Sequence, residues 1–157
     1  MREQRYHGHL KRFFPLLAAA MLVWWRWRPF RVEVEGKSMA PTLEPGDYLL
    51  AVISRGVRQG SLIVVEHPDR PGYEMVKRVA EVPGDEVDNR TLGPDEYWVT
   101  GDNEDESTDS RNFGPAGRNA IRGRVILRYW PIDRVAWLGV TVWLSACEER
   151  PPAWKSR

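Results

Sequence analysis

Short apolar or alternating runs, separated by turn-forming residues, fill most of residues 31–130. Residues 31–35 alternate polar and apolar side chains, which predicts a strand with one solvent-exposed face. Residues 48–53 are apolar throughout, which predicts a strand covered on both faces. The same criteria predict four more strands, at residues 61–66, 74–82, 96–100 and 124–129. The intervening turns contain Pro and Gly, and no helical period of useful length separates the runs, so the sequence predicts a mainly β fold, an antiparallel barrel or sandwich.

An uncharged, mostly apolar run covers residues 13–25. A helix over it would span roughly 20 Å, less than the roughly 30 Å hydrocarbon core of a bilayer. Basic residues precede the run and tryptophans lie at its far end, as at the two interfaces of a membrane span. The bulky Trp-Arg-Trp-Arg-Pro sequence at that end is unlike the small-residue cleavage site of a secretory signal peptide. We therefore interpret the run as a short transmembrane or interfacial anchor helix with a cytoplasmic N-terminus.

A second apolar run, at residues 135–147, is compatible with a strand, a short helix or a second membrane contact. The polar residues that follow it are typical of a disordered tail. The 157-residue chain thus divides into a basic N-terminus with an anchor helix (1–30), one β domain (31–147) and a tail (148–157).

Composition narrows the possible classes of function. The net charge of +1 gives no electrostatic argument for nucleic acid as a partner. The single cysteine, Cys147, excludes an internal disulfide. His7 and His9 lie in the basic N-terminus with no cysteine or carboxylate cluster nearby, so they do not predict a metal site. The sequence predicts neither a metal ion nor an organic cofactor.

Two residues of the predicted β domain are candidates for chemistry. Ser38 lies in the turn-rich connection at residues 35–47, where a serine commonly bonds to nearby backbone. The Gly-Lys-Ser sequence there is similar to the end of a phosphate-binding loop, but Arg31 occupies the position that requires glycine. Lys77 is predicted to share its strand face with apolar neighbours. Desolvation would then lower its pKa and let it act as a general base; an exposed lysine on the outer face of a barrel is the alternative.

The polar loop at residues 101–111 opens directly after a predicted strand. Its alternating residues Asp105, Ser107 and Asp109 allow a calcium-loop interpretation, although serine replaces the glycine that should follow the third ligand. A solvated acidic loop is a second interpretation. The third is a support loop, in which Asp109 pairs with Arg111 while Ser107 holds another group in place.

Taken together, these segments resemble the type I signal peptidases, which are the Ser/Lys leader peptidases. The similar segments, in chain order, are Ser-Met-x-Pro-Thr-Leu-x-Pro-Gly-Asp at 38–47, Lys-Arg-Val with Pro-Gly-Asp at 77–85, Gly-Asp-Asn with Ser-x-Asp-Ser-Arg at 101–111, and Gly-Arg-Val with Arg-Tyr-Trp-Pro at 123–131. The resemblance extends over residues 34–138. Any one segment is a weak signal, whereas all of them in this order form a specific one.

The resemblance implies a mechanism that needs no histidine. Ser38 would be the nucleophile and Lys77 the base that takes its proton. Ser107 would orient the lysine amine, while Asp109 and Arg111 would brace the loop.

The resemblance also implies an oxyanion site at the backbone N–H of Ser38. Many relatives have a hydroxyl two residues earlier as the second donor, but that position is Gly36 here, so the second donor would be backbone or water. Met39 is expected to contribute to the floor of the substrate site.

The expected protein is a membrane-associated serine endopeptidase that removes N-terminal signal peptides from secretory precursors. Its partners would be those precursors and membrane lipid. The anchor would span the cytoplasmic membrane once and place the catalytic domain on the extracytoplasmic side. The compact size also allows a small peptidase of the kind that trims the N-terminal extension of a nickel-type superoxide dismutase. A membrane-tethered β-barrel module that binds peptides without cleaving them is the non-enzymatic alternative.

Overall fold

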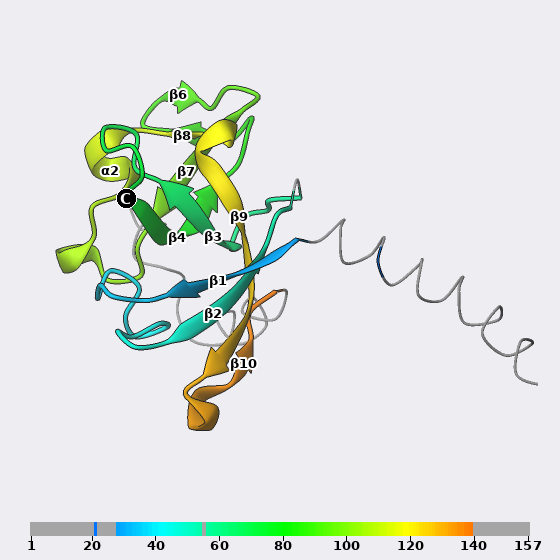
Figure 1. Cartoon of the computed structure of the whole chain (residues 1–157). Helices are drawn as coiled ribbons and strands as arrows, with labels where there is room; N and C mark the ends of the chain where they lie inside the picture. The colour runs from blue at the N-terminus through cyan, green and yellow to red at the C-terminus, as the bar shows by residue number, and fades with distance from the viewer. Residues whose placement is uncertain (1–20, 22–27, 55, 140–157) are drawn as a thin grey trace, which may run out of the picture.

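One large antiparallel sheet, in the order β1-β2-β9-β3-β4-β7-β8 with β10 also paired to β9, forms the body of the computed structural model, which describes residue 21 and residues 28–54 and 56–139 (Figure 1). Its strands are β1 (Pro29–Glu33), β2 (Tyr48–Val52), β3 (Leu62–Glu66), β4 (Glu74–Glu81), β7 (Glu96–Thr100), β8 (Ala116–Gly117), β9 (Ile121–Trp130) and β10 (Ala136–Trp137). A separate hairpin consists of β5 (Glu86–Val87) and β6 (Arg90–Thr91). The helical segments are η1 (Glu104–Glu106), α2 (Ser110–Phe113), η2 (Arg118–Ala120) and η3 (Ile132–Arg134). The predicted mainly β, antiparallel fold is confirmed.

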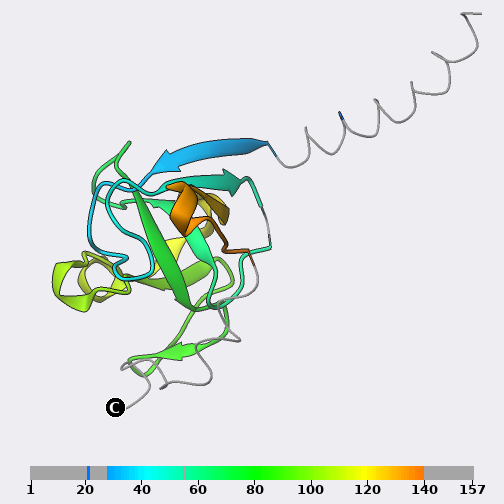
Figure 2. The same ribbon diagram turned by 90° about the horizontal axis from the view of Figure 1, so that it is seen from below.

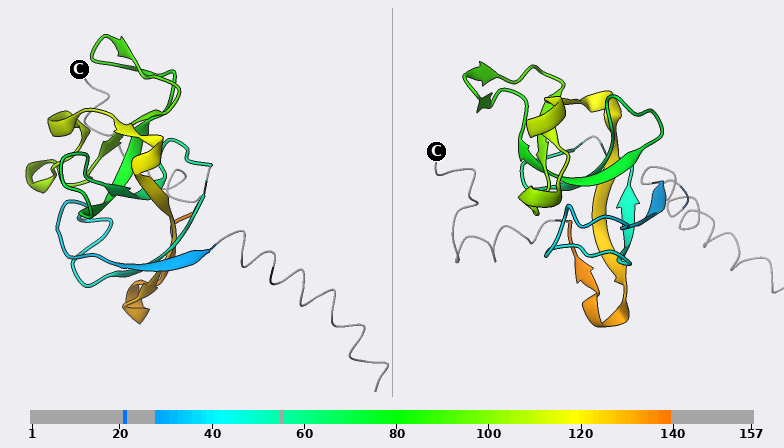
Figure 3. Two further views of the ribbon diagram at one scale, coloured as in Figure 1. Left: turned by 45° about the horizontal axis from the view of Figure 1, so that its top comes forward. Right: turned by 90° about the vertical axis from the view of Figure 1, so that its left-hand side faces the viewer.

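Strand β9 lies between β1–β2 on one side of the sheet and β3–β4–β7–β8 on the other. Near its start, Arg124 lies opposite Val52 of β2 and Ile63 of β3. Further along, Leu127 lies opposite Leu50 of β2 and Trp137 of β10. Strands β3 and β10 therefore follow one another along the same side of β9. Figure 3 shows β9 running from the upper part of the domain into the η3–β10 turn, and that turn faces the viewer when the domain is seen from below (Figure 2).

Two apolar clusters lie on opposite faces of β3. Leu62 and Val64 belong to the first cluster, and Ile63 and Val65 belong to the second. The burial of alternate residues on both sides follows from the alternation of side chains along a strand. The sequence analysis predicted a strand covered on both faces at residues 48–53. That prediction was wrong, because Tyr48 and Leu50 are only half-buried and Ile53 is exposed.

The remaining strand predictions need small corrections. The predicted strand 31–35 is β1, which starts and ends two residues earlier, and the predicted strand 124–129 starts at Ile121. The prediction for β7 matches its bounds, and β2, β3 and β4 each differ by one residue at one end. The hairpin β5–β6 was not predicted; its turn contains Asp88 and Asn89, which both have positive φ.

The predicted anchor helix at 13–25 lies outside the described residues apart from Met21, and so do residues 140–147 and the predicted tail. Of the second apolar run, Ala136 and Trp137 form β10, and Leu138 packs into the first apolar cluster. Among the residues that the structure describes, no helix has both the length and the apolar character needed to cross a membrane.

Candidate active site

Lys77 is the most unusual residue of the core. It lies in the middle of β4, opposite Ile63 of β3, and only 2% of it is exposed. Its neighbours on the same strand face, Met75 and Val79, pack into the second apolar cluster. Lysines are rarely buried this fully unless they are paired. The alternative of an exposed lysine on the outer face of a barrel is therefore wrong.

A chain of hydrogen bonds fixes the amine of Lys77. Its Nζ donates to Ser107 Oγ over 2.9 Å, and Ser107 Oγ donates to Asp109 Oδ2 over 2.7 Å. An ionised carboxylate only accepts hydrogen bonds, so the single hydroxyl proton of Ser107 points to Asp109 and its lone pair faces Lys77. One N–H of the amine is thereby used, and a neutral amine still keeps its lone pair for another group.

Asp109 is completely buried and accepts several hydrogen bonds. Besides Ser107, the backbone N–H of Gly101 donates to it over 2.9 Å, and the guanidinium of Arg111 donates through Nε and Nη2. Burial alone would raise the pKa of Asp109, but these donors, Arg111 first, lower it to about 2. The predicted pairing of Asp109 with Arg111 is present, and the carboxylate is ionised at neutral pH.

The pKa of Lys77 lies below the ordinary lysine value. Desolvation by burial is the largest cause, because it disfavours the charged ammonium. The charge of Asp109 acts in the opposite direction, and the charge of Arg111 lowers the pKa again. The environment of Lys77 therefore makes its amine easier to deprotonate than that of a free lysine, and the uncharged amine is the form that a general base needs.

Backbone contacts fix Ser38 beside this group. Its carbonyl oxygen accepts a hydrogen bond of 3.0 Å from the N–H of Asn103. Gly101 lies between Ser38 and Ser107: an added Cβ on this glycine would lie 2.2 Å from Ser107 Oγ and 2.4 Å from the carbonyl oxygen of Ser38. A Cβ at this position would clash with both atoms, so only glycine fits. The backbone of Ser38 is therefore a near neighbour of the Ser107 hydroxyl, which binds Lys77.

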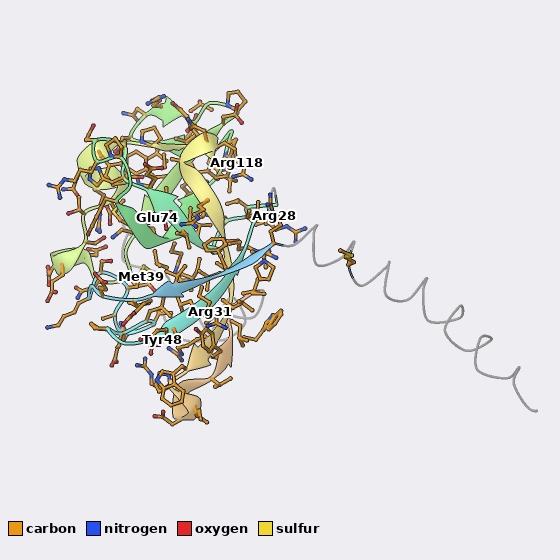
Figure 4. All side chains as sticks on the ribbon, viewed as in Figure 1. Arg28, Arg31, Met39, Tyr48, Glu74 and Arg118 are labelled. Atoms are coloured by element: carbon orange, nitrogen blue, oxygen red, sulfur yellow. The ribbon has the colours of Figure 1, made fainter. Side chains whose placement is uncertain are left out.

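The other two predicted site residues flank Ser38. Met39 is 1% exposed and packs in the first apolar cluster, so it attaches the connection between β1 and β2 (residues 34–47), which we call the Ser38 loop, to the core (Figure 4). Gly36 is exposed, and a Cβ on it would meet no atom within 4 Å. The space beside Gly36 is therefore open.

Sequence reasoning gave no role to the ion pair between Arg78 and Asp102. Arg78 donates through Nε and Nη2 to the two oxygens of Asp102, over 2.8 and 2.6 Å, and through Nη1 to the carbonyl of Gly60. This bidentate pair attaches the start of the 101–111 loop to β4, one residue from Lys77. Both residues lie in segments that carry the family resemblance, and Arg78 follows Lys77 directly, which is the signal in the sequence that could have found them.

Helix α2 holds the other end of that loop. Asp109 is its N-cap, and a capping box joins Asp109 and Asn112. The hydroxyl of Ser110 accepts from the N–H of Val99 on β7. The described residues contain no group of three or more His, Cys, Asp or Glu side chains that could hold a metal ion.

Comparison with known proteins places this site in a family. The family model described as "Signal peptidase, peptidase S26" matches residues 7–92 and 86–130. The chain belongs to the signal peptidase family, peptidase S26. The matched residues include Ser38, Lys77 and the loop that carries Ser107 and Asp109.

Several relatives are similar to this signal peptidase over most of their length. Mitochondrial inner membrane protease subunit 1 of Xenopus tropicalis is 39% identical over 116 residues, which cover 65% of this chain and 70% of that protein. The human protein of the same name is 32% identical over 123 residues, covering 68% and 73% of the two chains. The probable signal peptidase I-2 of Synechocystis sp. is 28% identical over 159 residues, covering 78% and 73%.

Membership of this family makes the protein a serine endopeptidase of the signal peptidase type, an enzyme that cleaves leader peptides. The non-enzymatic peptide-binding module considered from the sequence is therefore excluded.

Proposed function

We propose that this signal peptidase cuts leader peptides with Ser38 as the nucleophile and Lys77 as the general base. The observation that carries the proposal is the buried amine of Lys77, which donates to Ser107 and has a lowered pKa. A serine hydroxyl is a poor nucleophile until a neighbouring base accepts its proton, and a desolvated lysine can be that base.

The proposed reaction has two halves. Ser38 Oγ attacks the scissile carbonyl carbon while its proton moves to the amine of Lys77. The tetrahedral intermediate collapses, the C–N bond breaks, and the ammonium of Lys77 gives its proton to the leaving amine. A water molecule then attacks the acyl ester, with Lys77 again taking a proton and Ser38 regaining one.

The other predicted residues support this reaction without exchanging protons with substrate. Ser107 directs the amine of Lys77, and the ion pair of Asp109 and Arg111 directs Ser107. The backbone N–H of Ser38 is the proposed oxyanion donor. Gly36 offers no side chain, so a backbone group or water supplies the second donor.

We further propose that the substrate lies extended along the edge of β1 that has no strand partner among the described residues. This strand is at one end of the sheet and leads into the Ser38 loop. The site works at a membrane, as the names of the mitochondrial relatives indicate for those proteins. The N-terminal segment at 1–30 would cross the cytoplasmic membrane once and leave the domain at 31–147 on the extracytoplasmic side. Precursor proteins and membrane lipid are its partners.

The test is incubation of the purified full chain with a secretory precursor, followed by sequencing of the new N-terminus of the product. Ser38→Ala and Lys77→Met should each abolish cleavage while the thermal unfolding curve remains cooperative. Ser54→Ala and Arg70→Met are the control variants. Ser54 is half-buried and Arg70 is exposed, both lie outside the loops that carry Ser38 and Ser107, and both variants should retain activity. Cleavage by Ser38→Ala at the wild-type rate would refute the proposal.

The pH–rate profile examines the base directly. Because burial lowers the pKa of Lys77, the amine loses its proton below the roughly 10.4 of free lysine, and kcat/KM should rise with pH through an apparent pKa well under that value. A profile that rises only near 10.4 would contradict the assignment of Lys77 as base.

The choice between a secretory precursor and a dismutase extension needs both substrates in one assay. The leader-peptidase proposal predicts cleavage of the secretory precursor, and recovery of the native protein in the membrane fraction. Selective cleavage of a nickel-type superoxide dismutase precursor, together with recovery in the soluble fraction, would support the other substrate.

A further inference from the structure

A buried carboxylate outside the catalytic group lies at the end of the Ser38 loop. Asp47 is 1% exposed and precedes β2 directly. Its Oδ2 accepts from the backbone N–H of Glu44 over 3.0 Å and from Arg128 Nη1 over 3.1 Å, while its Oδ1 accepts from Arg134 Nη1 over 3.2 Å. We call Asp47, Arg128 and Arg134 the Asp47 network. A buried charge persists only when it is paired in this way.

Arg128 extends this network to the backbone of the Ser38 loop. It belongs to β9, and its side chain is 11% exposed. Its Nη1 also donates to the carbonyl of Thr42 over 2.9 Å, and its Nε donates to the carbonyl of Arg134 over 2.6 Å. The guanidinium of Arg128 thus binds Thr42 in the middle of the loop and Asp47 at its end. It also binds η3 through the carbonyl of Arg134. Only arginine has several donors in a fixed planar arrangement that can do so.

A compact turn connects Thr42 to Ser38. Within it, the N–H of Leu43 donates to the carbonyl of Met39 over 2.8 Å, and both of these side chains are buried. The base of the loop is closed where the N–H of Val34 donates to the carbonyl of Asp47 over 2.9 Å. Any movement of Thr42 or Asp47 is therefore transmitted to Ser38 through a short, closed backbone segment.

We propose that the Asp47 network positions the Ser38 loop for attack, and that neither arginine touches the substrate. The proposal rests on Ser38 being the nucleophile. The loop is attached on one side by the Asn103 N–H that binds the Ser38 carbonyl, and on the other by Arg128 at Thr42. Reacting atoms must be held to within a fraction of an ångström, so release of one attachment lowers the rate of attack without removing the base or the substrate contacts.

The experiment compares Asp47→Asn, Arg134→Met and Arg128→Met in the full chain, using a synthetic peptide that spans the cleavage site of a secretory precursor. We expect kcat to fall by about 10- to 100-fold in Arg128→Met, and by less in Arg134→Met, with KM within about threefold of wild type. The apparent pKa of the pH–rate profile should stay unchanged, because the network does not contact Lys77. Arg128→Lys should not restore kcat, since it keeps the charge but not the planar donors.

Arg90→Met is the matched control. Arg90 lies in the separate β5–β6 hairpin and pairs with Glu96 on the surface, away from the Ser38 loop and from β1. Its removal should leave kcat unchanged. All rates are measured well below the lowest unfolding midpoint, so that a loss of stability alone cannot lower kcat. If Arg128→Met does not fold, the kcat values of Asp47→Asn and Arg134→Met test the proposal instead. The side chain of Arg134 is only partly buried, so its replacement should disturb folding less.

Two results would overturn the proposal: kcat within threefold of wild type in folded Asp47→Asn and Arg134→Met, or a loss of kcat that disappears when the assay temperature is lowered. Ser38→Ala is included in the same series. If Ser38→Ala cleaves the peptide, the proposed nucleophile is wrong; if it is inactive while the network variants are fully active, only the positioning role is wrong.

Discussion

Replacement of Gly101 by alanine tests whether the close approach of two loops places the nucleophile. The φ angle of Gly101 is not in the left-handed region, so alanine can adopt the backbone conformation, and the perturbation is one of contact alone. The added Cβ would lie 2.2 Å from Ser107 Oγ, 2.4 Å from the Ser38 carbonyl oxygen and 2.7 Å from Ser107 Cβ.

Neither neighbour of this Cβ can move away freely. Ser107 Oγ is bonded to Lys77 and Asp109, and the Ser38 carbonyl is bonded to the N–H of Asn103. Ordinary contacts need about 3.5 Å, so the two loops must separate by roughly 1 Å. Overpacking of this kind destabilises by about 1–3 kcal/mol. A displacement of about 1 Å between reacting groups lowers the rate by roughly 100-fold.

The assay measures kcat/KM for Gly101→Ala on a precursor peptide, together with its thermal midpoint. We expect a loss of about 100-fold in a protein that is still folded at the assay temperature. Gly56→Ala is the control, because the nearest atom to its added Cβ, Ser54 Oγ, lies at 3.9 Å. Wild-type activity in Gly101→Ala would show that the packing of Ser38 against this loop does not set the geometry of attack.

Two further predictions concern the charged end of the hydrogen-bond chain. Arg111→Met removes a cation that lowers the pKa of Lys77, so the rising limb of the pH–rate profile should move to higher pH; an unchanged limb would contradict this electrostatic coupling. The pKa of Asp109 is lowered to about 2 in the folded protein, so its ionised form contributes about 2 kcal/mol above pH ~4, and this contribution is lost as the pH falls through about 2. The difference in unfolding free energy between wild type and Asp109→Asn, measured by urea titration, should therefore shrink by that amount between pH 6 and pH 2, and a constant difference would argue against it.

The strands could be predicted where the side-chain pattern reflects the sheet directly. Strand β7 has its predicted bounds, and Lys77 shares a face with Met75 and Val79 as the alternation requires. The pattern failed for β2, because apolar residues on an end pair of strands can remain half-exposed. It could not show α2, since four residues are too few for a helical period, although the capping residues Asp109 and Asn112 are visible in the sequence.

The contacts that assemble the candidate site join residues far apart in the chain. Lys77 meets Ser107 across 30 positions, and Arg128 meets Asp47 across 81. No local periodicity encodes such a pair, so only the resemblance to a known family suggested the first, and nothing suggested the second. Asp47 and Arg128 both lie in segments that carry this resemblance, but their role depends on β9 passing beside the loop.

Arg111 determines how the carboxylate of Asp109 acts on Lys77. An isolated carboxylate at the end of the hydrogen-bond chain would orient Ser107 but would also favour the protonated ammonium of Lys77. Arg111 binds the same carboxylate through two nitrogens, and its positive charge offsets part of the effect of Asp109 on the pKa of Lys77. The carboxylate oxygen still accepts the hydroxyl proton of Ser107. The carboxylate of Asp109 therefore orients Ser107, while Arg111 limits how far that carboxylate raises the pKa of Lys77. This accounts for two ionised side chains close to an amine whose own charge is disfavoured by burial.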